Sequence, residues 1–75
     1  MLTLIAVNFC GKEIRTNCAI SITHKEITFS YEGYSHTVKY KETRRGNYFL
    51  LKGIRYYFKV WDNYENKWLI DCNCF

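Results

Sequence analysis

The chain of 75 residues lacks proline altogether and contains only four glycines, which occur singly. It therefore has no Pro-rich or Gly/Ser-rich segment that would mark a linker, and it shows no internal repeat or low-complexity stretch. We expect residues 1–75 to form a single domain.

Long apolar runs are also missing. The apolar residues at the start of the chain end before Asn8, well short of the roughly 20 residues that a membrane-spanning helix needs. The same stretch lacks the basic leader and the cleavage-type ending of a secretory signal peptide. We expect residues 2–9 to be a first strand, the protein to be cytoplasmic, and no membrane to be among its partners.

Residue patterns that support catalysis are scarce. The two histidines are His24, which falls in a predicted turn, and His36, which falls among apolar residues and is expected to be packed. The carboxylates form no close acid/base pair and have no calcium-loop spacing, and no glycine-rich phosphate loop is present. We expect a protein that is not an enzyme and has no cofactor, with a small Cys/His metal or redox protein as an alternative.

The four cysteines are Cys10, Cys18, Cys72 and Cys74. Structural zinc ligands usually come in pairs separated by two to four residues, and neither pair here has that spacing. The four residues would form a metal site only if the first and last strands are neighbours. Disulfides would require an oxidising compartment. We expect reduced, structural thiols, with a metal site or two disulfides as the alternatives.

Alternation of apolar and polar residues is the dominant pattern that the sequence does contain. It predicts strands over residues 2–9, 18–23, 26–31, 34–41, 48–51, 54–61 and 67–72. Residues 14–17 fit either a short strand or a helical turn, and residues 42–47 are expected to be a polar turn. Glu32-Gly33 and Lys52-Gly53 have the composition of two-residue hairpin turns.

These elements predict an all-β fold. Six or seven short strands joined by hairpin-length turns favour a small antiparallel meander. We expect it to be a closed or nearly closed barrel, SH3-like or OB-like, or else a compact sandwich. Closure would also protect the edges of such short strands.

The strand predicted over residues 54–61 has two contrasting faces. One face is expected to lie in the core and carries Ile54, Tyr56, Phe58 and Val60. The opposite face mixes cations with large rings and carries Arg55, Tyr57, Lys59 and Trp61. We regard this second face as the candidate binding surface.

Basic residues concentrate around the same strand. Seven of the eleven lysines and arginines lie between residues 39 and 59, where Glu42 is the only carboxylate. The further candidates for the binding surface are Lys39, Lys41, Arg44 and Arg45. Lys39 and Lys41 would join it if their strand lies in the same sheet. Glu42 is expected to balance the charge of the adjacent arginines.

Three interpretations of this surface remain open. Trp, Tyr and Arg are the usual hot-spot residues of protein interfaces, so the first is a protein-binding module that acts as an inhibitor or adaptor of a larger machine. Small phage-encoded inhibitors of host defence nucleases share this size, an analogy that no residue motif supports. The second is single-stranded nucleic-acid binding, with cations for phosphates and rings for bases. The third is a solvated sheet face on which Lys and Arg stems cover the rings.

Overall fold

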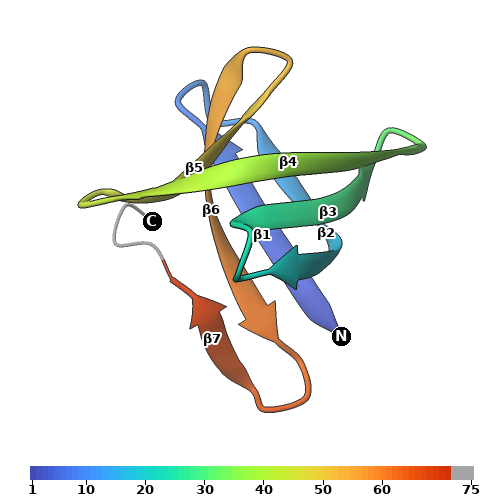
Figure 1. Ribbon diagram of the computed structural model, residues 1–75. Coiled ribbons are helices and arrows are strands. Elements are labelled where there is room, and N and C mark those ends of the chain that lie inside the picture. The colour runs from blue at the N-terminus through green and yellow to red at the C-terminus, as the bar shows by residue number, and fades with distance from the viewer. Residues whose placement is uncertain (72–75) are drawn as a thin grey trace.

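The computed structural model describes residues 1–71 and is built entirely from antiparallel strands (Figure 1). The strands in chain order are β1 (Leu2–Asn8), β2 (Glu13–Ser21), β3 (Glu26–Tyr31), β4 (Tyr34–Thr43), β5 (Gly46–Leu51), β6 (Ile54–Asp62) and β7 (Lys67–Ile70). Each strand pairs with the next, and β1 also pairs with β6. The first six strands therefore close into a barrel, with β7 as an additional strand.

The predicted all-β meander is confirmed in its closed-barrel form. The strand order follows the chain order throughout, which makes the barrel an up-and-down type and distinguishes it from the Greek-key order of the OB fold. Full closure of the first six strands excludes the sandwich alternative.

Two-residue turns connect the predicted hairpins. Glu32 and Gly33 have φ values of 53° and 81°, and Lys52 and Gly53 have values of 54° and 78°. Two consecutive positive φ values are typical of the type I′ turn, whose twist matches that of the flanking strands. These turns set the pairing of β3 with β4 and of β5 with β6, because each closes directly onto its strand ends.

The strand β2 is longer and begins earlier than the sequence pattern indicates. Residues 14–17, which fitted either a short strand or a helical turn, belong to this strand. Ile14 is buried and the residues on either side of it are exposed. The reason is that β1 needs a partner along nearly its full length, from Leu2 opposite Cys18 to Val7 opposite Glu13. The expected strand position of Ile22 is wrong, because the strand ends at Ser21 and Ile22 is exposed in the following turn.

The strands around the β4–β5 turn and β7 also differ from their expected bounds. The turn predicted over residues 42–47 contracts to Arg44 and Arg45, because Thr43 pairs with Gly46. The last strand ends at Ile70. Its predicted terminal residue, Cys72, lies outside the described residues.

The barrel interior is filled by side chains from all six barrel strands. The buried apolar residues are Leu4, Ala6, Ile14, Ile27, Phe29, Tyr40, Phe49, Leu51, Tyr56, Phe58 and Val60. Phe58 lies at the centre of the aromatic part, in contact with the rings of Tyr40 and Phe49. Interdigitated rings of this kind contribute large buried areas to a small core.

The central strand β6 has β1 along one edge from Tyr56 to Asp62. Its other edge is shared, because β5 pairs with its first half and β7 with its last residues, with a bulge between Val60 and Trp61. Its predicted inward face is confirmed for Tyr56, Phe58 and Val60, which are buried.

The prediction that Ile54 is buried is wrong, since its side chain is 43% exposed. It is the first residue of β6, directly after the Lys52-Gly53 turn, where the barrel opens to solvent. Alternation places Ile54 on the inward side, but no neighbouring strand covers that end of the barrel.

The strand β1 has apolar residues on both faces and lies between β2 and β6, as expected for a central strand. Its last residue, Asn8, is the buried polar residue of the barrel. Its side-chain Oδ1 accepts hydrogen bonds from the backbone N–H groups of Cys10 and Lys12 at 2.9 and 3.0 Å. These bonds shape the β1–β2 turn without a proline. Residues 1–71 contain no helix that is long and apolar enough to cross a membrane.

Candidate functional site

The outward face of β6 lies beside outward residues of β5 and β7. In an antiparallel sheet, directly opposite residues project from the same face. Tyr48 of β5 lies opposite Tyr57, and Trp68 of β7 lies opposite Trp61. We call the resulting surface the basic aromatic face, and it consists of Tyr48, Arg55, Tyr57, Lys59, Trp61 and Trp68.

The first half of this face is a pair of tyrosines covered by an arginine. The ring centroids of Tyr48 and Tyr57 are 5.7 Å apart. The guanidinium carbon of Arg55 lies 4.3 Å from the Tyr48 centroid, which is a cation–π contact. This contact favours one arrangement of the arginine side chain before any partner arrives.

The second half repeats this arrangement with tryptophans. The rings of Trp61 and Trp68 meet edge to face, with centroids 5.0 Å apart and an interplanar angle of 77°. The Lys59 ammonium lies 4.5 Å from the Trp68 centroid. Trp68 is 38% exposed, so this ring is both packed and accessible.

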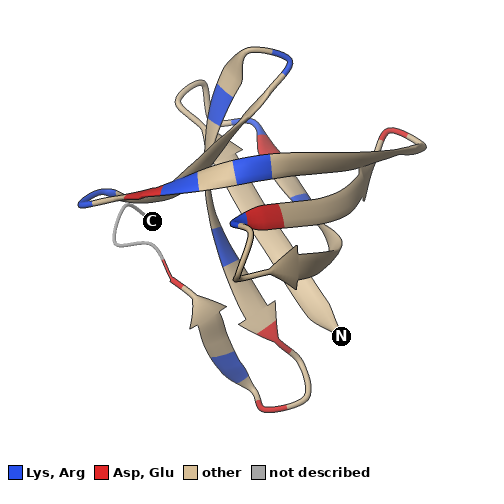
Figure 2. Ribbon diagram, viewed as in Figure 1, with Lys and Arg blue, Asp and Glu red and all other residues tan. Residues whose placement is uncertain are grey.

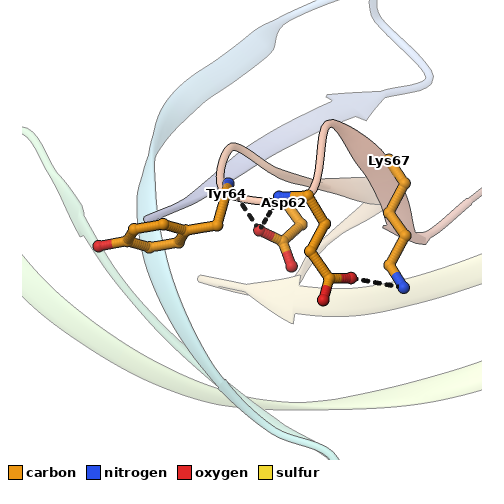
Figure 3. A network of polar contacts seen from close by, with 4 residues as sticks. Asp62, Tyr64 and Lys67 are labelled. Atoms are coloured by element: carbon orange, nitrogen blue, oxygen red, sulfur yellow. Dashed lines mark hydrogen bonds and ion pairs between the residues drawn. The ribbon is translucent and has the colours of Figure 1, made fainter.

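The β6–β7 turn, which leads into Trp68, is closed by a network of polar contacts (Figure 3). The Asp62 carboxylate accepts hydrogen bonds from the backbone N–H groups of Tyr64 and Glu65, at 2.9 and 3.3 Å. Lys67 forms a 2.6 Å ion pair with Glu65 across the turn. Asn63 also donates side-chain hydrogen bonds to the Met1 carbonyl and the Thr3 hydroxyl, at 3.0 and 2.8 Å. The turn is therefore tied to β1 as well as to β6.

Apolar side chains flank the rings and cations on both sides. On β1, Ile5 lies opposite Lys59 and Val7 lies opposite Tyr57, and both are half-buried. On β5, Leu50 lies opposite Arg55 and is 54% exposed. The basic aromatic face is consequently bordered by aliphatic side chains on β1 and β5.

The other predicted site residues lie on or near the β4–β5 hairpin. Lys41 lies opposite Tyr48 and extends the basic aromatic face onto β4. Lys39 lies one pleat further along β4, where its opposite residue is Glu26 of β3. Arg44 and Arg45 form the turn at the end of the hairpin, which Figure 2 shows as a basic tip at the side of the molecule.

Glu42, which was expected to balance the charge of Arg44 and Arg45, forms its ion pair with a different cation. Its carboxylate is bound by Lys25, which comes from the β2–β3 turn. This hydrogen bond raises the pKa of the Lys25 ammonium. The two segments meet because the Tyr40 N–H donates a 2.8 Å hydrogen bond to the Lys25 carbonyl. The one carboxylate of the hairpin is thus occupied by a cation from another part of the barrel.

Nine of the eleven lysines and arginines fall into two groups. The ion-paired cations are Lys12, Arg15, Lys25 and Lys67. Within residues 1–71, no carboxylate forms an ion pair with Lys39, Lys41, Arg44, Lys52 or Arg55. All five members of this second group lie between residues 39 and 55, so positive charge without a paired carboxylate is concentrated there.

The two described cysteines are far apart. Cys10 is exposed in the β1–β2 turn, whereas Cys18 lies opposite Leu2 at the other end of the same hairpin. The five-residue offset between the Val7–Glu13 and Leu2–Cys18 pairs corresponds to about 16 Å, which is too long for a disulfide or for shared metal ligation. Burial raises the pKa of the Cys18 thiol to about 11, so it is protonated at neutral pH.

The other residues considered for metal or nucleophilic chemistry have structural contacts. His36 stacks on Phe29 with centroids 5.6 Å apart, and His24, in its turn, shares a 3.1 Å hydrogen bond with Ser21. No group of three or more His, Cys, Asp or Glu residues within 1–71 could hold a metal ion. The further metal candidates Cys72 and Cys74 lie outside the described residues.

Sequence reasoning missed Tyr48 and Trp68 as members of the face. The two-residue Lys52-Gly53 turn carries the signal for Tyr48, since closing it pairs residues 51 with 54 and hence 48 with 57. The turn before Lys67, which is rich in Asp and Asn, likewise places Trp68 near Trp61, apart from the bulge.

The described surface has no pocket in residues 1–71, and the candidate site is the outer, convex side of the barrel. In comparisons with protein families, curated proteins and solved structures, no family model, protein or structure matches this chain.

Proposed function

We propose that the chain is a cytoplasmic, non-enzymatic binding protein that docks on another protein through the basic aromatic face, as an inhibitor or adaptor. The observation that carries this proposal is the repeated arrangement of two rings with one cation stacked on them. It occurs at Tyr48, Tyr57 and Arg55 and again at Trp61, Trp68 and Lys59. Tyr, Trp and Arg in this combination are the residues that contribute most to protein interfaces.

The aliphatic border of the face favours a protein partner over a nucleic acid at this position. Ile5, Val7 and Leu50 interleave with the rings, and a protein partner gains from covering such side chains because their burial is favourable in itself. A nucleic acid gains less from covering these aliphatic side chains, because its phosphates bind cations and its bases stack on rings. Aromatic residues and arginine are also enriched in protein interfaces relative to the rest of the surface.

The positions of the two cations in the unbound protein also support the proposal. A side chain that is rich in rotamers costs about 0.5–1.5 kcal/mol to immobilise in an interface. Arg55 is already held on the Tyr48 ring and Lys59 on the Trp68 ring, so part of this cost is met in the unbound protein. The planar guanidinium of Arg55 keeps its N–H donors at its edge, where a partner carboxylate is able to accept two of them.

The test is an affinity pull-down from an extract of the native host, with and without nuclease treatment. Trp68→Ala removes an exposed ring of the face, whereas Tyr64→Ala removes a ring that is 84% exposed on the adjacent turn and serves as the matched control. We expect the wild type and Tyr64→Ala to retain the same protein, and Trp68→Ala to weaken its binding by about tenfold or more. Nuclease treatment should leave the captured protein unchanged.

Two results would overturn the proposal. One is retention of every captured protein by both Trp68→Ala and Arg55→Ala, with folding verified by far-UV circular dichroism. The other is loss of all captured proteins on nuclease treatment, which would show that nucleic acid carries the association.

A further inference from the structure

We propose that the β4–β5 hairpin is a second binding site, which holds the phosphate backbone of single-stranded nucleic acid. The residues that carry it are Lys39 and Lys41 on β4 and Arg44 in the turn. All three are exposed. This site goes beyond the proposed protein-binding function, because it uses neither tryptophan of the basic aromatic face.

The charge of the hairpin is the first argument. Its one carboxylate, Glu42, is bound by Lys25, and no other carboxylate of residues 1–71 forms an ion pair with Lys39, Lys41 or Arg44. The ion pairs of Lys12, Arg15 and Lys67 lie elsewhere on the barrel. Glu26 of β3 lies opposite Lys39 but forms no ion pair with it. A hairpin on which cations outnumber carboxylates in this way is expected to attract a polyanion.

The spacing of the cations is the second argument. Lys39 and Lys41 project from the same side of β4 and are separated by about 6.5–7 Å along the strand. Arg44 continues the row at the turn, which lies at the side of the molecule (Figure 2). A linear row of cations of this kind follows an extended, regularly charged polymer, as in other single-strand binding surfaces.

A ring beside the row distinguishes a nucleic acid from other polyanions. Lys41 lies directly opposite Tyr48, so a strand whose phosphates contact the lysines places a base near the Tyr48 ring, where the base replaces the Arg55 guanidinium that is stacked there in the unbound protein. Stacking of a base on an aromatic side chain is worth about 1–3 kcal/mol. An acidic polypeptide would gain the charge contacts without this stacking.

The experiment is fluorescence anisotropy of the full chain with labelled oligothymidine of about 20 nucleotides, at several salt concentrations. The hairpin variant combines Lys39→Gln, Lys41→Gln and Arg44→Gln. The matched control combines Lys12→Gln, Arg15→Gln and Lys67→Gln, which removes the same charge from exposed, ion-paired positions.

We expect the wild type to bind with an affinity that falls as salt rises. Three phosphate contacts correspond to a slope of log K against log salt of about −2. The hairpin variant should bind at least about tenfold more weakly, with most of that slope lost, while the matched control should stay within about threefold of the wild type. Arg44→Gln alone should reduce the magnitude of the slope by about 0.7, because one phosphate contact is lost. Since this residue lies in an exposed turn, the single variant still tests the site if the triple variant misfolds.

Three results would overturn this inference: no binding at low salt, equal weakening in both triple variants, or equally strong competition by polyglutamate. Equal weakening would mean that net charge alone drives association. Competition by polyglutamate would mean that the site takes acidic polypeptide. Trp68→Ala should leave oligothymidine binding unchanged, so failure of this site and failure of the proposed protein interface give different results.

Discussion

The alternation of faces along β6 is open to a direct test with two adjacent residues. Phe58 is fully buried, and its ring meets Tyr40 edge to face at 5.2 Å and Phe49 at 5.5 Å. Tyr57 is half-buried on the outer face, and its ring pairs with Tyr48. Phe58→Ala should therefore destabilise the protein strongly, and Tyr57→Ala should do so only weakly.

The expected magnitudes differ by more than the error of the measurement. Truncating a buried phenylalanine to alanine costs about 3–5 kcal/mol, because apolar contacts are lost and a cavity remains. Tyr57→Ala loses one ring pair, worth about 0.5–1.5 kcal/mol beyond the area that the ring buries. Because the side chain is only half-buried and leaves no closed cavity, the total cost should stay below that of Phe58→Ala. At about 0.05–0.15 kcal/mol per residue, the whole domain is stable by about 4–11 kcal/mol. Phe58→Ala therefore removes a large share of the free energy of unfolding.

Equilibrium unfolding in urea, followed by tryptophan fluorescence and far-UV circular dichroism, measures both variants. Coincident transitions with the two probes would verify two-state unfolding. Should Phe58→Ala prove unfolded in buffer, Phe58→Leu retains part of the side chain and preserves the comparison. A loss for Tyr57→Ala as large as that for the Phe58 variants would refute the face assignment, and with it the basic aromatic face.

Two further predictions concern the thiols and a turn. Because burial raises the pKa of Cys18 from 9.0 to about 11, the unfolded state loses this proton first as pH rises, so stability should fall between about pH 9 and 11. After allowance for partial exposure, the share of this fall due to Cys18 is about 1 kcal/mol. Cys18→Ala should lack that share and keep the part due to Tyr40 and to Lys12, Lys25 and Lys67, whose pKa values are also raised. Iodoacetamide below pH 9 should label Cys10 before Cys18 in peptide mapping. Gly53 has a φ of 78°, and a Cβ added there would meet no atom within 4 Å. Gly53→Ala should therefore lower the free energy of unfolding in urea by about 1–2 kcal/mol, through backbone strain alone. An unchanged stability would contradict the type I′ turn.

The fold was accessible from the sequence because its signals are local. A period of two identified the strands, and Gly33 and Gly53 marked hairpins whose positive φ values favour glycine. The bounds of β2 were not accessible, since they depend on pairing with β1. Ile54 shows a similar limit, because alternation gives the direction of a side chain but not whether another strand covers it.

The candidate site depended more on tertiary structure. The outward direction of Tyr57 followed from the pattern within β6, whereas the positions of Tyr48 and Trp68 beside it required the pairing register. The ion pair of Glu42 with Lys25 joins residues 17 positions apart in the sequence. Nothing in the local pattern pointed to that pair, because it forms only when the β2–β3 turn reaches β4.

The two proposed surfaces meet at Tyr48. Lys41 flanks this ring on one side and the Arg55 guanidinium is stacked on it. If both proposals hold, a base that stacks on Tyr48 must displace Arg55 from the ring, and Arg55 is then no longer positioned for a protein carboxylate. The Trp61–Trp68 pair, held by the Asp62 turn, is unaffected by such a move. Nucleic acid bound on the hairpin would therefore weaken the contacts of the protein partner with the Tyr48, Tyr57 and Arg55 half of the basic aromatic face. The contacts with the Trp61, Trp68 and Lys59 half would remain.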